Sequence, residues 1–133
     1  MADQATMELI KFVCENCLIE EDIDNGQPTY PVCLAILARM SILNSHIVFS
    51  KNRSNSVWKT FEFNVPSETE PRCLIGQRPS RCGDRLTVLI EEIVDELTAY
   101  FLDKEPTIQS CHMVLNSELR KCTIKINYYS RIE

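Results

Sequence analysis

The segment from Arg81 to Lys104 is the feature of this sequence that most constrains its fold. Apolar side chains recur there at three- and four-residue steps, as on one face of a helix, while acidic side chains occupy the other face. The apolar members are Leu86, Leu89, Ile90, Ile93, Val94, Leu97 and Phe101. Because a lone helix of this length is only marginally stable in water, the segment predicts a long helix whose apolar face is buried against the rest of the chain.

Two further helices are predicted in the N-terminal third of the chain. Residues 4–19 carry an apolar stripe at helical spacing, and residues 29–43 are apolar on nearly all sides, with a proline in the expected first turn. Between them, residues 20–28 combine acidic side chains with an Asn-Gly pair and a proline. That composition predicts a solvated loop.

Two segment pairs have the pattern of β-hairpins. The first pair is residues 46–50 and 57–65, joined by the polar stretch KNRSNS, and the second is residues 111–115 and 122–129. Alternation in the first pair places Val57, Phe61, Phe63 and Val65 on one face, with Lys59 as the polar exception. The whole pattern predicts an α+β fold, in which an antiparallel sheet from two hairpins packs against a long central helix and two N-terminal helices.

Composition narrows the class of protein. A chain of 133 residues fits a single globular domain spanning residues 1–133, and 44% hydrophobic with 25% charged residues is ordinary for such a domain. The formal net charge of −5 argues against charge-driven binding to nucleic acid. No segment reads as a secretory signal or as the roughly 18 apolar residues of a membrane span. We therefore expect an intracellular protein, nuclear or cytoplasmic, that does not bind membranes.

Seven cysteines are many for this length, but their number is odd and most lie in apolar runs, so we expect free thiols in the core and no cofactor. The alternative is a small zinc-binding regulatory domain that uses Cys14-x-x-Cys17, two thiols on one face of the first predicted helix. Zinc would need two more ligands, for which Cys33 and His46 are candidates. Both cysteines of the pair also fit the apolar stripe, which favours core packing.

A catalytic site is not expected. Only two histidines, His46 and His112, are available as bases. His112 follows Cys111 directly, and neighbours on a strand point to opposite faces of a sheet, so this pair cannot activate a thiol. The sequence therefore predicts that the protein is not an enzyme.

The long irregular stretch 66–83 is the main candidate for a binding surface, since connections of this length are usually functional. It brings basic side chains to the start of the long helix, where free backbone N–H groups favour an anion such as a phosphate or an acidic peptide. The alternative is a solvated basic loop that balances the acidic helix. The candidate partner-binding residues are Arg72, Arg78, Arg81, Arg85 and, on the solvent face of the strand at 57–65, Trp58.

The runs HIVFSKNRSNSVWKTFEFNV, RLTVLIEEIVDELTAYF and CTIKINYYS, within residues 45–130, resemble the middle of HORMA domains. This resemblance implies a non-enzymatic adaptor of chromosome, DNA-repair or autophagy complexes that captures a partner peptide beside its sheet. Family members continue into a C-terminal segment that wraps around the peptide, whereas this sequence stops at Glu133. The expected modes are therefore peptide addition at an open sheet edge, or formation of a homodimer or heterodimer.

Overall fold

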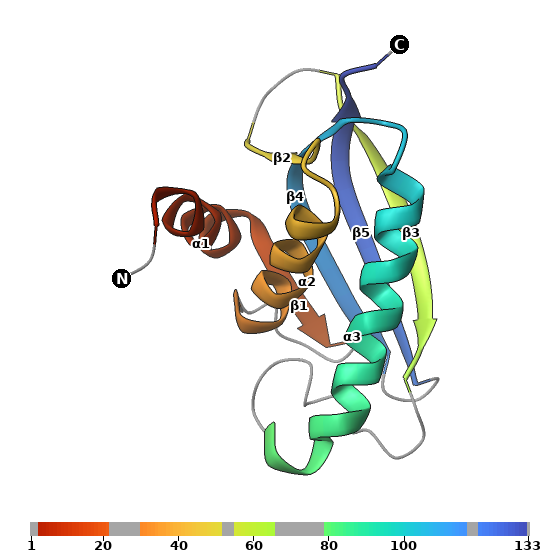
Figure 1. Cartoon of the computed structure of the whole chain (residues 1–133). Coiled ribbons are helices and arrows are strands. Elements are labelled where there is room, and N and C mark those ends of the chain that lie inside the picture. Colours follow the sequence, from red (N-terminus) through yellow and green to blue (C-terminus); the bar gives the residue numbers. More distant parts are fainter. Residues whose placement is uncertain (1–2, 22–29, 52–54, 66–78, 117–119, 133) are drawn as a thin grey trace.

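The computed structural model describes residues 3–21, 30–51, 55–65, 79–116 and 120–132. These residues form three helices and five strands, an α+β architecture (Figure 1). In chain order the elements are α1 (Gln4–Asn16), β1 (Cys17–Glu21), α2 (Tyr30–Leu43), β2 (Val48–Phe49), β3 (Val57–Asn64), α3 (Pro79–Phe101), β4 (Pro106–Asn116) and β5 (Lys121–Ser130). All three predicted helices are thus present, and the predicted α+β class is confirmed.

The five strands form one mixed sheet, so the prediction of an antiparallel sheet is wrong in part. The strand order is β1-β4-β5-β3, and β2 also pairs with β4. Strands β3 and β4 each run antiparallel to β5, whereas β1 and β2 run parallel to β4. Parallel neighbours require a crossover connection, and here the crossovers contain the helices that follow β1 and β2.

Of the two predicted hairpins, only the second is confirmed. Strands β4 and β5 pair from Pro106↔Ser130 to Asn116↔Lys121. Strands β2 and β3 do not pair with each other, since β2 pairs with β4 and β3 pairs with β5. Alternating side chains indicate a strand and its buried face, but they do not show which strand is its neighbour. Here β2 and β3 each pair with a strand that is distant in the sequence.

Strand β1 was not predicted, and it replaces the end of the first predicted helix. Helix α1 ends at Asn16, whose side-chain amide donates to the carbonyl of Phe12 at 3.0 Å. The next residue, Cys17, is already extended at φ −119° and ψ 142°. The strand includes Glu20 and Glu21, which were predicted to lie in a loop. Charged residues are common at the edge of a sheet, where they discourage unwanted strand pairing.

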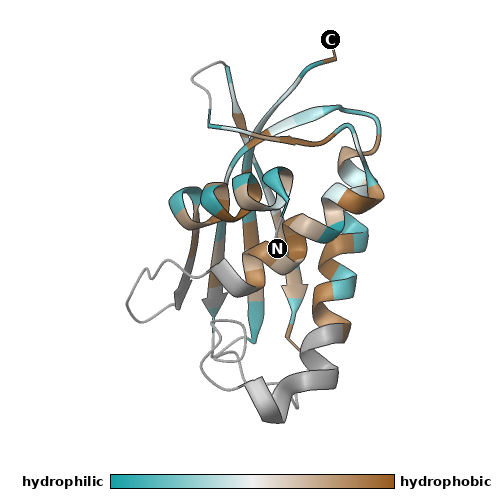
Figure 2. Ribbon diagram, turned by 60° about the vertical axis from the view of Figure 1, so that its left-hand side comes forward, coloured by the Kyte–Doolittle hydropathy of each residue, from teal (hydrophilic) through white to brown (hydrophobic). Residues whose placement is uncertain are grey.

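The helices cover one face of the sheet. Helices α2 and α3 lie side by side in front of the strands, and α1 lies beside α2 (Figure 1). Helix α3 therefore shares the face with α2, which corrects the prediction that the long helix is the central one. Hydrophobic and hydrophilic residues alternate along the coloured part of α3 (Figure 2). Its predicted apolar face is confirmed by the buried side chains of Leu89, Ile93, Val94, Leu97 and Phe101.

The strands contribute the predicted side chains to this core, with one exception. Phe61, Phe63 and Val65 are buried, and so is the apolar face of β5 from Cys122 to Tyr128. Val57 was predicted to join them but is exposed at the start of β3. Among the residues that the model describes, no helix combines the length and the apolarity needed to cross a membrane.

An aromatic cluster anchors the C-terminal end of α3 to the sheet. The ring of Phe101 packs edge-on against Tyr100 and Tyr128, with both centroid separations 4.9 Å, and the hydroxyls of the two tyrosines are 2.7 Å apart. The ammonium group of Lys59 lies 5.1 Å from the ring centroid of Tyr100 and 5.7 Å from that of Phe61. These cation–π contacts explain how a lysine is accommodated on the inner face of β3.

Candidate functional site

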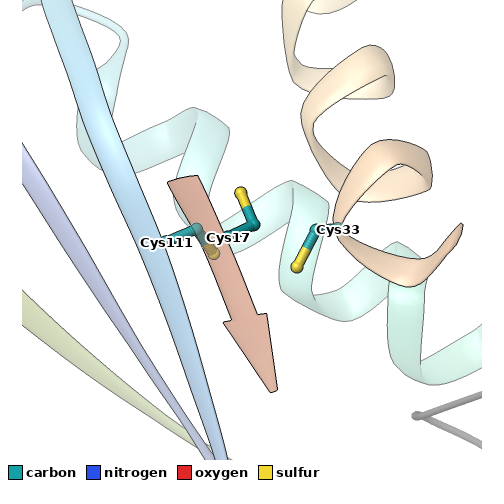
Figure 3. A group of neighbouring side chains, drawn as sticks. All are labelled: Cys17, Cys33 and Cys111. Carbon is teal, nitrogen blue, oxygen red and sulfur yellow. The ribbon is translucent and has the colours of Figure 1, made fainter. Parts of the chain in front are cut away.

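Three buried cysteines from three separate elements meet in the core. Cys17 begins β1, Cys33 lies in α2 and Cys111 lies in β4, and their Sγ atoms are all within 4.8 Å of one another. Figure 3 shows the three side chains arriving from these elements at one place between the sheet and α2. We call this group the cysteine triad. All three side chains are nearly or completely excluded from solvent.

The parallel pairing of β1 with β4 creates the triad. Cys17 and Cys111 are register partners in that pair, so their side chains leave the sheet on the same face. That face is the one covered by the helices, and α2 contributes Cys33 from above it. The site therefore depends on β1, the strand that the sequence pattern does not reveal.

Hydrogen bonds among the thiols make the three groups electrostatically unequal. Bonds from Cys111 and then Cys17 lower the pKa of Cys33 to about 4, against the opposing effect of burial. The bonds to Cys17 and Cys33, together with burial, raise the pKa of Cys111 well above its ordinary value. The thiol hydrogen bonds thus favour the ionised form of Cys33 and the neutral form of Cys111.

The predicted zinc ligands are separated by the structure. Cys14 is exposed on α1, whereas Cys17 is buried on β1, because the helix ends between them. The prediction that these two thiols share a helical face is therefore wrong. Cys33, which was considered as a further ligand, does join Cys17. His46 does not, since it is exposed and its Nδ1 lies 3.3 Å from Oε1 of Glu105.

Cys111 was missed as a member of this group, although one signal for it was present. Strand alternation in residues 111–115 already places Cys111 on the buried face, together with Met113. The sequence pattern did not indicate β1, the strand that places Cys17 beside Cys111. The expectation that Cys111 and His112 point apart is confirmed, because Cys111 lies opposite Ile126 in the core and His112 lies opposite the exposed Lys125.

The exposed side of β3 is a second candidate site. Trp58 is 57% exposed, and Thr60, Glu62 and Asn64 on the same face of the strand are exposed as well. Strand β3 ends the sheet order, and within the described residues it pairs with β5 alone. One row of its backbone N–H and C=O groups is therefore directed away from the sheet.

The four predicted arginines are the third candidate site. Arg72 and Arg78 lie outside the described residues. Arg81 and Arg85 lie in the first turns of α3, but their side chains are not among those that the model describes. Their role in binding stays a prediction.

A shallow groove of about 430 Å³ lies between α1, α2 and β2. Its lining includes Leu9, Ile42, Val48 and Phe49, and Ile42 is 83% exposed. The groove offers apolar surface but no cluster of charged groups, with Glu8 as the one acidic side chain in its lining.

Comparisons with family models, with curated proteins and with solved structures find no match to this chain. The resemblance to HORMA domains therefore stays a prediction from the sequence.

Proposed function

We propose that this chain is a non-enzymatic protein-interaction module that adds an extended segment of a partner protein to the outer edge of β3. The observation that carries the proposal is the position of β3, an eight-residue strand that ends the sheet order. An edge strand of this length presents enough backbone groups to pair with a partner strand. Main-chain hydrogen bonds would supply the affinity, and alternate side chains of the partner would supply the specificity.

Trp58 gives this edge an anchor for side-chain recognition. It lies in the second position of β3, next to the exposed Val57. Tryptophan is enriched among the residues that contribute most to binding, because its large ring buries much apolar area and its N–H still donates a hydrogen bond. The partner segment is expected to place an apolar side chain against the Trp58 ring and to extend along Thr60 and Glu62.

The resemblance to HORMA domains supports the same class of function. It implies an adaptor subunit of a chromosome, DNA-repair or autophagy complex, acting as part of a homodimer or heterodimer. An acidic patch on the partner would then find a second contact at Arg72, Arg78, Arg81 and Arg85. The main contact in this proposal remains the β3 edge.

Replacing Trp58 by alanine is expected to weaken partner binding at least about tenfold, as for a central anchor of an interface. Binding segments are first selected from a library of random peptides that favour extended conformations, and their dissociation constants are then measured for wild type and variant. The matched control is Ile42→Ala, which removes a side chain that is 83% exposed on α2 at the groove. Equal affinities for wild type and Trp58→Ala, or a loss confined to Ile42→Ala, would place binding elsewhere.

A further inference from the structure

We propose that Cys17, Cys33 and Cys111 form a three-thiolate site for a soft d¹⁰ metal ion such as Zn²⁺ or Cu⁺. The site is independent of the proposed binding at β3, since it lies in the core between β1, α2 and β4. Its ligands differ from the Cys14-x-x-Cys17 pair that the sequence suggests. Thiolates are the ligands that select Zn²⁺ and Cu⁺ over harder ions such as Mg²⁺ and Ca²⁺.

The spacing of the three sulfur atoms suits a common metal ion. A Zn–S bond is about 2.3 Å long, so three thiolates around one ion lie about 3.8 to 4.0 Å apart, in tetrahedral or trigonal arrangement. The three Sγ atoms of the triad are all within 4.8 Å of one another. The largest separation allowed by that bound exceeds the tetrahedral spacing by about 1 Å. Small side-chain rotations are therefore enough to bring the three sulfurs onto one ion.

The ligands come from three separate elements, so an ion bound to them would link distant parts of the fold. Each comes from a different element, with Cys17 on an edge strand, Cys111 on its neighbour and Cys33 on the helix above them. An ion held by all three would fasten β1 and the start of α2 to β4. Cys122, on the adjacent strand β5, is buried to the same degree and does not belong to the triad. Burial alone therefore does not bring the cysteines together.

Metal binding is expected to stabilise the folded chain. An unfolded chain does not hold the three thiolates in place, so the free energy of binding adds to the free energy of unfolding. The ligands must lose their protons when the ion binds, so affinity should fall as the pH is lowered. Both effects distinguish a bound ion from three thiols that simply fill space in the core.

The test uses the full chain, reduced and freed of metal with a chelator. Portions are incubated with Zn²⁺, Cd²⁺ or Cu⁺ supplied as a stabilised complex, and then passed through a desalting column. We expect one ion to be retained per chain, a higher melting temperature, and thiolate-to-metal charge-transfer absorption in the Cd²⁺ sample. The separate arms show which ion of this class binds most tightly.

Cys33→Ala and Cys111→Ala are expected to reduce metal affinity at least about a hundredfold. The matched controls are Cys122→Ala, which removes an equally buried thiol, and Cys14→Ser, which removes the other member of the sequence motif. Both controls should bind as wild type does. Circular dichroism establishes that each variant is folded before its affinity is compared.

If the alanine substitutions prevent folding, metal binding by the wild-type protein alone still tests the proposal. No retained metal and no charge-transfer absorption in wild type would overturn the proposal. It would equally be overturned if Cys33→Ala bound metal as wild type does, or if non-reducing mass spectrometry of freshly isolated protein found two cysteines of the triad joined in a disulfide.

Discussion

Replacing Phe101 by alanine is expected to lower the free energy of unfolding by about 3 to 5 kcal/mol. The Phe101 side chain is fully buried at the last residue of α3, with its ring edge-on to Tyr100, Tyr128 and Phe61. Removing the ring leaves a cavity and abolishes all three contacts, of which those with Phe61 and Tyr128 join α3 to β3 and β5. Equilibrium unfolding in urea, followed by circular dichroism, measures the loss.

The neighbouring residue supplies the control for this prediction. Leu102 is 65% exposed, so Leu102→Ala removes an apolar side chain that lies mostly in solvent and should change the free energy of unfolding by only about 0.5 kcal/mol. Comparable losses for the two variants would mean that α3 does not present Phe101 to the sheet. The packing of α3 against β3 and β5 would then be incorrect.

Raising the pH from 7 to 10.5 is expected to remove about 2 kcal/mol of stability through Cys122 alone. Burial, and then the nearby negative charge of Cys33, raises the pKa of Cys122 from 9.0 to about 12. The folded chain therefore keeps this thiol neutral while the unfolded chain ionises it. The contribution of this raised pKa to the free energy of unfolding is therefore complete below about pH 9 and is lost as the pH rises toward 12.

Parallel unfolding curves of wild type and Cys122→Ala isolate this contribution. The variant lacks the thiol, so its stability should decline less steeply above pH 9, whatever constant difference the substitution causes at neutral pH. Identical slopes for the two proteins would contradict the burial of an ionisable Cys122. Other alkaline groups, such as lysines and tyrosines, are common to both curves and cancel in the difference.

The parts of the fold that depend on local periodicity are predictable from the sequence. The apolar stripe through Leu89, Ile93 and Leu97 identifies α3 and its buried face, since three- and four-residue spacing has one structural meaning. Alternation from Cys122 to Tyr128 likewise identifies β5 and its buried face. In both segments the local pattern and the tertiary packing agree.

The choice of strand partners is where prediction from the sequence failed. Residues 46–50 and 57–65 looked like the arms of a hairpin, yet each pairs with a strand from the C-terminal third. Strand β1 was hidden because Cys17 continues the apolar stripe of α1 and acidic residues follow it. Strand pairing depends on packing between distant segments, and the periodicity of one segment does not indicate its partner.

Of the candidate sites, the one that depends on a local pattern was predictable from the sequence and the one that depends on strand pairing was not. Trp58 was identified correctly as exposed, because alternation in one strand is enough to place it. Two members of the cysteine triad, Cys17 and Cys33, were considered as ligands, but with Cys14 in place of Cys111. Finding the third member required the parallel register of β1 and β4, and no short motif encodes a register between residues that far apart.

Hydrogen–deuterium exchange on the protein with and without a selected partner peptide tests directly whether β3 accepts an extended segment. Backbone amides on the outer edge of β3 exchange freely unless a partner strand covers them. We predict that the peptide slows exchange within Val57–Asn64 and leaves α1 and α2 unchanged. If the peptide slowed exchange in the residues that line the α1–α2–β2 groove and left exchange in β3 unchanged, binding at the β3 edge would be contradicted.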